Sequence, residues 1–147
     1  MGRAIAVARR GIGAGQLPFG AAIVRGTKVI ACEHNSVAAT GDPTAHAEVS
    51  AIRAACLKLG RRDLPDCQVY STCEPCAMCM GACYAAGVSR VYFGAFISDK
   101  HDFGMRDLGV GAVVLGRLGR GAPRVVGGVC RRQCVELFRL YGQAARK

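Results

Sequence analysis

The sequence predicts an α/β fold, and more specifically a three-layer α/β/α sandwich. Helical segments with one apolar face alternate along the chain with short apolar strands. A strand, a helix and a second strand follow one another between residues 67 and 95, which implies a right-handed crossover between parallel neighbours. Because 147 residues suffice for one hydrophobic core, we expect a single domain over residues 1–147.

The first half of the chain predicts two helices and a hairpin. Residues 3–13 favour a short helix that ends at the glycines of GIGAG. The stretches PFGAAIV and KVIACE are typical of two strands joined by a turn at residues 25–26. In DPTAHAEVSAIRAACLKLG, Asp42 or Thr44 is the expected N-cap of a helix that Gly60 ends.

The second half begins with the strand CQVYST, followed by a helix over residues 75–86 that Gly87 closes and by the strand RVYFGA. Residues 99–122 are rich in glycine and carry no clear periodicity. RVVGGV is a candidate fifth strand. CRRQCVELFRLYGQ predicts a terminal helix with Phe138 and Tyr141 facing the core.

Composition restricts the partners and the compartment. A net charge of +10 makes nucleic acid a possible partner, although the basic residues are dispersed in runs of two at most. Nine cysteines, an odd number in a chain of this length, argue against a complete disulfide framework and favour a reducing compartment. The apolar run at the N-terminus is too short for a signal peptide or a membrane span. We therefore expect a cytoplasmic protein with no membrane partner.

Three cysteines spaced three apart in STCEPCAMC pose the question of which of them bind a metal. Pro75 favours the first helical turn, so the helix begins there and Cys73 stays behind at the strand end. Cys76 and Cys79 then share one helix face, and the positive helix end favours their thiolate forms. Glu74, just before the proline, is expected to favour the helix start electrostatically.

Zinc needs three or four protein ligands, and His46 and Glu48 stand at the start of the other helix. Residues two apart do not share a helix face, but at the very N-terminus both can lean over the helix end. One imidazole and two thiolates leave an open position for water, which defines a catalytic zinc site with Glu48 beside that water. We expect one Zn²⁺ per subunit, with a bound water or hydroxide, on His46, Cys76 and Cys79.

His46-x-Glu48 followed by Pro75-Cys76-x-x-Cys79 is the signature of zinc deaminases that act on bases. The sequence resembles the cytidine deaminase superfamily, which implies an α/β/α fold with a central mixed five-stranded sheet. HNSVAATGDPTAHAEVSAIRAAC and STCEPCAMCMGA look most like bacterial guanine deaminases and their plant guanosine relatives. The resemblance also implies a homodimer in which the C-terminal segment of one subunit covers the site of the other.

Hydrolytic deamination explains why these residue types occur together. Zinc makes a hydroxide that attacks the carbon bearing the exocyclic amine. Glu48 takes the water's proton and passes it to the ring nitrogen and then to the departing amine. The expected reaction is guanine to xanthine plus ammonia, with a small-molecule nucleobase or nucleoside as partner.

The resemblance implies three substrate-binding residues, each of which also has a structural alternative. Phe19 would pack against the base, or belong to the core. Asn35 would contact the base, or serve the turn that follows its strand. Asp107 would accept hydrogen bonds from a purine, but the family pattern Gly-Phe-Asp-Asp reads Gly-Met-Arg-Asp here, with Arg106 in place of the first acid.

Other functions remain open beside guanine deamination. Cytosine, guanosine and aminotriazines are alternative substrates of the same chemistry. A tRNA adenosine deaminase would use the positive charge to hold RNA phosphates. That family, however, has a motif similar to TLEPC and a Gly-Ala-Ala-Gly-Ser loop, and this chain has TCEPC and FISDKHDFG at those places. A non-enzymatic, zinc-stabilised nucleic-acid-binding domain is the third, and it would have no use for Glu48.

Overall fold

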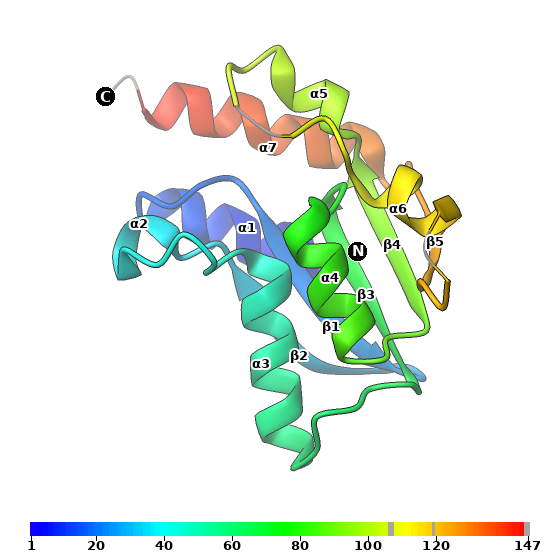
Figure 1. Cartoon of the computed structure of the whole chain (residues 1–147). Coiled ribbons are helices and arrows are strands. Elements are labelled where there is room, and N and C mark those ends of the chain that lie inside the picture. Colours follow the sequence, from blue (N-terminus) through cyan, green and yellow to red (C-terminus); the bar gives the residue numbers. More distant parts are fainter. Residues whose placement is uncertain (106–107, 119, 146–147) are drawn as a thin grey trace.

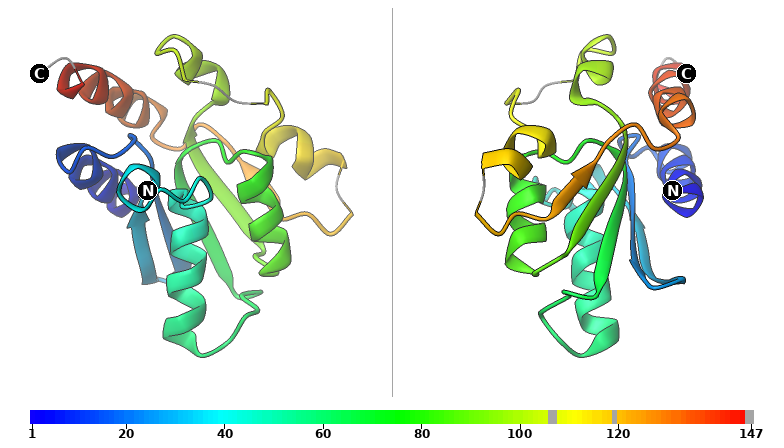
Figure 2. Two further views of the ribbon diagram at one scale, coloured as in Figure 1. Left: turned by 60° about the vertical axis from the view of Figure 1, so that its left-hand side comes forward. Right: turned by 90° about the vertical axis from the view of Figure 1, so that its right-hand side faces the viewer.

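A computed structural model describes residues 1–105, 108–118 and 120–145 of the chain (Figure 1). One five-stranded sheet, with strand order β2-β1-β3-β4-β5, lies between two layers of helices (Figure 2). This arrangement confirms the three-layer α/β/α sandwich with a mixed five-stranded sheet.

The sheet combines an antiparallel half with a parallel half. β1 pairs antiparallel with both β2 and β3, whereas β3 and β4 are parallel, as are β4 and β5. The candidate fifth strand in RVVGGV is therefore confirmed, and it is short. The strands are β1 (Gly20–Arg25), β2 (Lys28–His34), β3 (Cys67–Cys73), β4 (Arg90–Ala95) and β5 (Arg124–Val126).

Helices cover both faces of the sheet. α3, α4 and α6 lie on one face, and α1 and α7 lie side by side on the other (Figure 2). No helix in the described ranges is long and apolar enough to cross a membrane. The helices are α1 (Gly2–Gly13), α2 (Val37–Thr40), α3 (Ala47–Leu59), α4 (Ala77–Ala85), α5 (Ile97–His101), α6 (Ala112–Leu118) and α7 (Arg131–Ala144).

Two helices begin later than the sequence predicts. α3 is capped by His46, and the predicted caps form a turn before it, in which Asp42 Oδ1 accepts hydrogen bonds from the Thr44 backbone N–H and hydroxyl. α4 is capped by Cys76, one residue beyond Pro75. Both shifts place a metal-ligand candidate at a cap rather than inside a helix.

The main core lies between the sheet and the α3–α4 layer. Ile23, Val69 and Phe93 of the sheet are fully buried there. Ala51 and Ala55 face them from α3, and their small side chains let the helix approach closely. Because β3 and β4 are parallel, their carboxyl ends meet at one edge of this core, beside the N-termini of α3 and α4.

Candidate active site

The structure brings His46, Cys76 and Cys79 together at that edge. His46 Nδ1 lies 3.8 Å from Cys76 Sγ and 3.5 Å from Cys79 Sγ, and the two sulfurs are 3.7 Å apart. A tetrahedral zinc with bonds of about 2.1 Å to nitrogen and 2.3 Å to sulfur has ligand separations of about 3.6–3.8 Å. The three atoms therefore fit zinc in both chemistry and spacing, and they form a group able to hold a metal ion.

Helix caps create this convergence. His46 and Cys76 are the N-caps of α3 and α4, and both have extended backbones, with φ/ψ of −66/152° and −69/174°. Cys79 lies one turn into α4, on the side of the Cys76 sulfur. Both helix N-termini point at the cluster, where their positive ends favour thiolates.

The thiols and the imidazole are strongly coupled. The pKa of Cys76 is lowered to about 3, first by its hydrogen bond with Cys79 and also by His46, despite burial. The pKa of Cys79 is raised, first by the interaction with Cys76 and then by burial, while that of His46 is raised chiefly by Cys76. Of the two thiols, Cys76 is thus the one that more readily forms a thiolate.

Glu48 stands next to the three ligand atoms and is almost completely buried. Its Oε1 accepts a hydrogen bond from the Ser71 hydroxyl at 2.9 Å, and its Oε2 accepts one from the Cys79 thiol at 3.4 Å. Burial is the main cause that raises the pKa of this carboxyl above its ordinary value. A carboxyl whose pKa is raised in this way accepts a proton more readily than an exposed carboxyl does.

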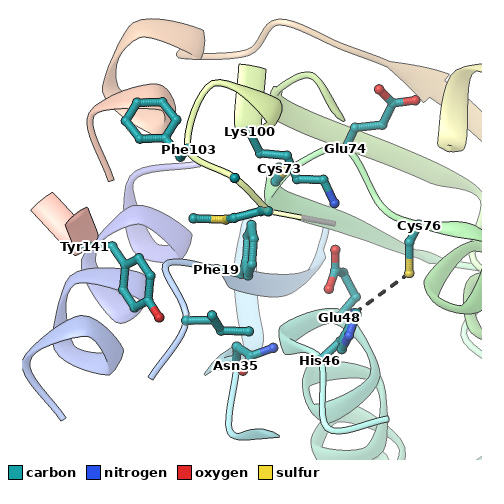
Figure 3. A pocket seen from close by; sticks show the side chains of 13 residues that line it. Phe19, Asn35, His46, Glu48, Cys73, Glu74, Cys76, Lys100, Phe103 and Tyr141 are labelled. Atoms are coloured by element: carbon teal, nitrogen blue, oxygen red, sulfur yellow. Dashed lines mark hydrogen bonds between the residues drawn. The ribbon is translucent and has the colours of Figure 1, made fainter. Parts of the chain in front are cut away.

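A cavity of about 410 Å³ opens in front of this group (Figure 3). Polar side chains line the part near the ligands, and apolar ones line the outer part. The lining residues are Leu17, Phe19, Asn35, His46, Glu48, Cys73, Glu74, Cys76, Lys100, Phe103, Gly104, Met105 and Tyr141. The size suits a small heterocyclic ligand.

Two of the three predicted substrate residues line this cavity. Asn35 is 1% exposed, and its Oδ1 accepts the backbone N–H of Val37 at 3.1 Å, which leaves its NH₂ as the group that can reach a ligand. Phe19 lines the cavity and also packs edge to face on Phe138 at 6.0 Å, so it belongs to both cavity and core. Asp107, with its neighbour Arg106, lies outside the described residues.

Several residues that line the cavity were not predicted as site residues from the sequence. Tyr141 packs against the buried residues Ala8, Ile12 and Leu137 as predicted, and it also lines the cavity. Phe138 is buried as predicted. Glu74 does more than favour a helix start: its carboxylate accepts the backbone N–H groups of Ile97 and Val113 at 3.2 and 3.0 Å. Lys100 lies in the segment for which the sequence has no periodicity. Burial raises the pKa of the Cys73 thiol. Cys73 is not part of the group formed by His46, Cys76 and Cys79.

Fold and site together define a deaminase of the zinc-binding type. A model of the cytidine and deoxycytidylate deaminase zinc-binding region matches residues 1–95, and the chain belongs to this family. It is 47% identical over 106 residues to the guanine deaminase of Bacillus subtilis, across 71% of this chain and 68% of that protein. It is 42% identical over 98 residues to the tRNA-specific adenosine deaminase of Aquifex aeolicus, across 67% of this chain and 64% of the relative.

Among solved structures, the guanine deaminase of Nitrosomonas europaea superposes with a TM-score of 0.88 at 28% identity, covering 97% of this chain and 82% of that one. The matched part of the chain spans about two thirds of the length of each of the two sequence relatives. All three relatives are named as deaminases, two of guanine and one of adenosine in tRNA.

Proposed function

We propose that this chain is a zinc-dependent hydrolytic deaminase of a free nucleobase, and that its substrate is guanine, converted to xanthine and ammonia. One observation carries this proposal. His46, Cys76 and Cys79 converge at zinc-ligand spacing while the buried carboxylate of Glu48 stands beside them at the wall of a cavity. The identity of 47% with a guanine deaminase favours guanine among the bases.

His46, Cys76 and Cys79 would hold the ion. Bound zinc supplies a Lewis acid that makes water nucleophilic near neutral pH. The coupled thiols suit this task because Cys76 already favours the thiolate. Cys79 loses its proton when the metal binds.

Glu48 would move the protons. It accepts one proton from the attacking water and gives it to the ring nitrogen, then takes the remaining proton of the same oxygen and gives it to the amine, which leaves as ammonia. The Ser71 hydroxyl fixes the carboxylate through its bond to Oε1, and Oε2 is the oxygen on the side of the ligands. Asn35 would donate to a ring acceptor, and Phe19 would pack against the base.

We further propose that residues 1–147 act as one domain in a cytoplasmic homodimer. Exposed apolar side chains on α4 and α6 support self-association, since Tyr84 is 60% and Leu118 is 78% exposed. Sedimentation equilibrium of the purified protein checks the proposal. A monomer at micromolar concentration would contradict it.

A tRNA adenosine deaminase is the second candidate. It is favoured by the 42% identity with such an enzyme and by the net charge of +10, which would attract RNA phosphates. Both candidates use the same metal site, so the cavity decides between them.

Ammonia release tests the proposal directly. The zinc-loaded protein is assayed with guanine, guanosine, cytosine, adenine, an aminotriazine and a tRNA anticodon hairpin. Turnover of guanine well above the other substrates supports the proposal. Turnover confined to the hairpin would replace it with the second candidate, and turnover of none would contradict both.

A further inference from the structure

Helices leave part of one face of the sheet open. In the right-hand view of Figure 2, α1 and α7 lie over the end of this face nearest the candidate active site, and no helix of the described ranges lies over the opposite end. Strand register identifies the residues there, because cross-strand partners point to the same side of a sheet. This open sheet face consists of Val29 of β2, Val24 of β1, Gln68 and Tyr70 of β3, Arg90 and Tyr92 of β4, and Arg124 and Val126 of β5.

Residues of the open sheet face alternate with residues of the core. Val69 and Val91, which lie between members of the face on β3 and β4, are completely buried under α3 and α4. By contrast, Val29 and Val126, at the two edges of the sheet, are 39% and 37% exposed. Parallel strands are usually covered on both faces, yet β3, β4 and β5 are parallel and exposed on this one. The exposed surface on the parallel half of the sheet suggests a binding partner.

Two tyrosines form a stacked pair in the middle of the open sheet face. Tyr70 and Tyr92 are cross-strand partners, with ring centres 4.8 Å apart and ring planes 12° from parallel. The Tyr70 hydroxyl donates a hydrogen bond to Gln68 Oε1 at 3.4 Å. Val126, the partner of Tyr92 on β5, has no ring with which to continue the stack. A planar group from a ligand can therefore lie on Val126 and against Tyr92.

Two arginines stand beside the tyrosine pair. Arg90 and Arg124 are cross-strand partners on β4 and β5, and both are exposed. Burial raises the pKa of Tyr70, and the charge of Arg90 opposes that shift, so this charge reaches the stacked rings. Like charges placed opposite each other destabilise a sheet, and the open sheet face contains no carboxylate to balance them. Asp66, just before β3, is paired with Arg61. This arrangement favours an anionic partner that also carries planar groups.

A second copy of this chain fits the open sheet face poorly. In a two-fold dimer the same patch meets itself, which would bring Arg90 and Arg124 toward like charges with no carboxylate between them. Duplex nucleic acid offers phosphates, but its bases are stacked inside the helix and present only their edges. A single strand offers both a phosphate chain and bases with free faces. Because cellular DNA is mostly duplex, RNA is the single strand that fits.

We propose that the open sheet face binds single-stranded RNA, with a base stacked on Tyr92 and neighbouring phosphates on Arg90 and Arg124. The face lies at the end of the sheet away from the candidate active site (Figure 2). RNA bound there would not place a base at the metal ligands. The inference therefore goes beyond the proposed function and does not depend on which substrate is deaminated.

Fluorescence anisotropy with a labelled oligouridine of about ten nucleotides tests the stacking contact. Loss of one base stack should weaken binding about 5- to 100-fold in Tyr92→Leu, while Tyr92→Phe should stay within about threefold of wild type. Tyr84→Leu is the matched control, because Tyr84 is 60% exposed on α4, away from this face, and should bind like wild type. Val126→Glu places a carboxylate at an exposed position of the face and should also weaken binding, so the test stands even if Tyr92→Leu does not fold.

Salt dependence tests the phosphate contacts. In Arg90→Gln/Arg124→Gln, loss of two contacts should weaken binding about tenfold and lower the slope of log affinity against log salt concentration by about 1.4. The control pair Arg9→Gln/Arg132→Gln removes the same charge from exposed positions of α1 and α7. It should change affinity by less than about threefold and leave the slope as in wild type.

Tm and ammonia release from guanine are measured for every variant and should match wild type, because the open sheet face lies outside the candidate active site. No binding of the oligouridine overturns the proposal. Equal losses in Tyr92→Leu and Tyr84→Leu, or equal competition by the same RNA annealed to its complement, would replace it with general attraction by the net charge. Dissociation of a dimer by Val126→Glu with RNA binding unchanged would assign the face to a second copy instead. All of these results leave guanine deamination untouched.

Discussion

The extended backbones of two cap residues decide the geometry of the metal group. With about 100° of rotation per helical residue, His46 and Glu48 would point roughly 200° apart inside a helix. His46 instead has an extended conformation just before α3, and Glu48 lies in the first turn of that helix. Both side chains can therefore reach the same point beyond the helix end. Cys76 repeats this arrangement at α4.

The ligand role of Cys79 is tested against a neighbouring cysteine. Cys79→Ser removes one of three protein ligands and should reduce bound zinc from about one per chain to nearly none after dialysis. Cys83→Ser, one turn further along α4 and equally buried, should keep the metal because Cys83 is not in the ligand group. Elemental analysis of both variants gives the answer. Equal zinc content in the two would remove Cys79 from the site.

The site residues that could be predicted from the sequence are those whose spacing is set by local structure. His46, Glu48, Cys76 and Cys79 were predicted from helix starts and metal chemistry, and the structure brings them together. Lys100 and Tyr141 were missed as site residues for a physical reason. Their place in the cavity depends on how α5 and α7 pack on distant segments, and no local pattern encodes that packing.

At the scale of elements, α1 lies so close to β1 that only glycine fits between them. A Cβ on Gly20 would collide with the Ala4 carbonyl oxygen and lie 2.9 Å from the Ala8 backbone nitrogen. Gly20→Ala should therefore lower the free energy of unfolding by about 1–3 kcal/mol through overpacking. Gly81→Ala, within α4, meets nothing within 4 Å and should raise it by about 0.5–1 kcal/mol. Urea denaturation measures both, and similar effects in the two variants would contradict this packing.

The link between α5 and α7 predicts a pH dependence. The hydrogen bonds from Arg131 are the main cause that lowers the pKa of Asp99 below its ordinary 3.8. A lowered carboxyl pKa stabilises the fold above the ordinary value, and this contribution is lost as the pH falls through the lowered one. Arg131→Met should thus lower the free energy of unfolding at pH 7 and lower it progressively less below pH 3.8.

Arg139→Met is the control for that variant, because Arg139 pairs with Glu136 in an exposed position and should contribute little at any pH. Arg131 also lies 5.0 Å from the centre of the Phe96 ring. If the unfolding free energies of Arg131→Met and Arg139→Met still differ at low pH, the remaining difference reports this cation–π contact. A difference in unfolding free energy that does not change with pH would exclude the ion pair as its source.

At the scale of the whole molecule, the candidate active site joins segments that are far apart in the sequence. The residues that line the cavity lie in or near β1, β2, β3, α3, α4, α5 and α7. The parallel pairing of β3 and β4 brings these segments to one edge of the sheet. A metal held by α3 and α4 would tie the two helices of one layer together.

Metal removal should therefore act on global stability. If zinc at about 100 times its Kd contributes about 2.7 kcal/mol, chelation should lower Tm by roughly 5–10 °C in a chain of this size. Added zinc should restore Tm in the wild type and have no effect on Cys79→Ser. Differential scanning calorimetry provides the measurement, and an unchanged Tm after complete zinc removal would contradict a metal that bridges α3 and α4.

The layered fold could be predicted almost entirely from the sequence, because strand and helix periodicities are clear up to residue 95. The segment over residues 99–122 could not. Its two short helices, α5 and α6, depend on the Glu74 carboxylate, which accepts backbone N–H groups at both. Such long-range contacts override weak local preferences, so the segment has no pattern of its own.

Glu48→Gln is the decisive variant, because the change keeps the shape of the side chain and removes its ability to carry a proton. Zinc content and ammonia release from guanine are measured side by side for wild type and variant. The proposed proton transfer by Glu48 predicts equal zinc content and a loss of kcat of about a thousandfold or more in Glu48→Gln. Undiminished ammonia release by the zinc-loaded variant would contradict the role of Glu48 and, with it, the proposed mechanism.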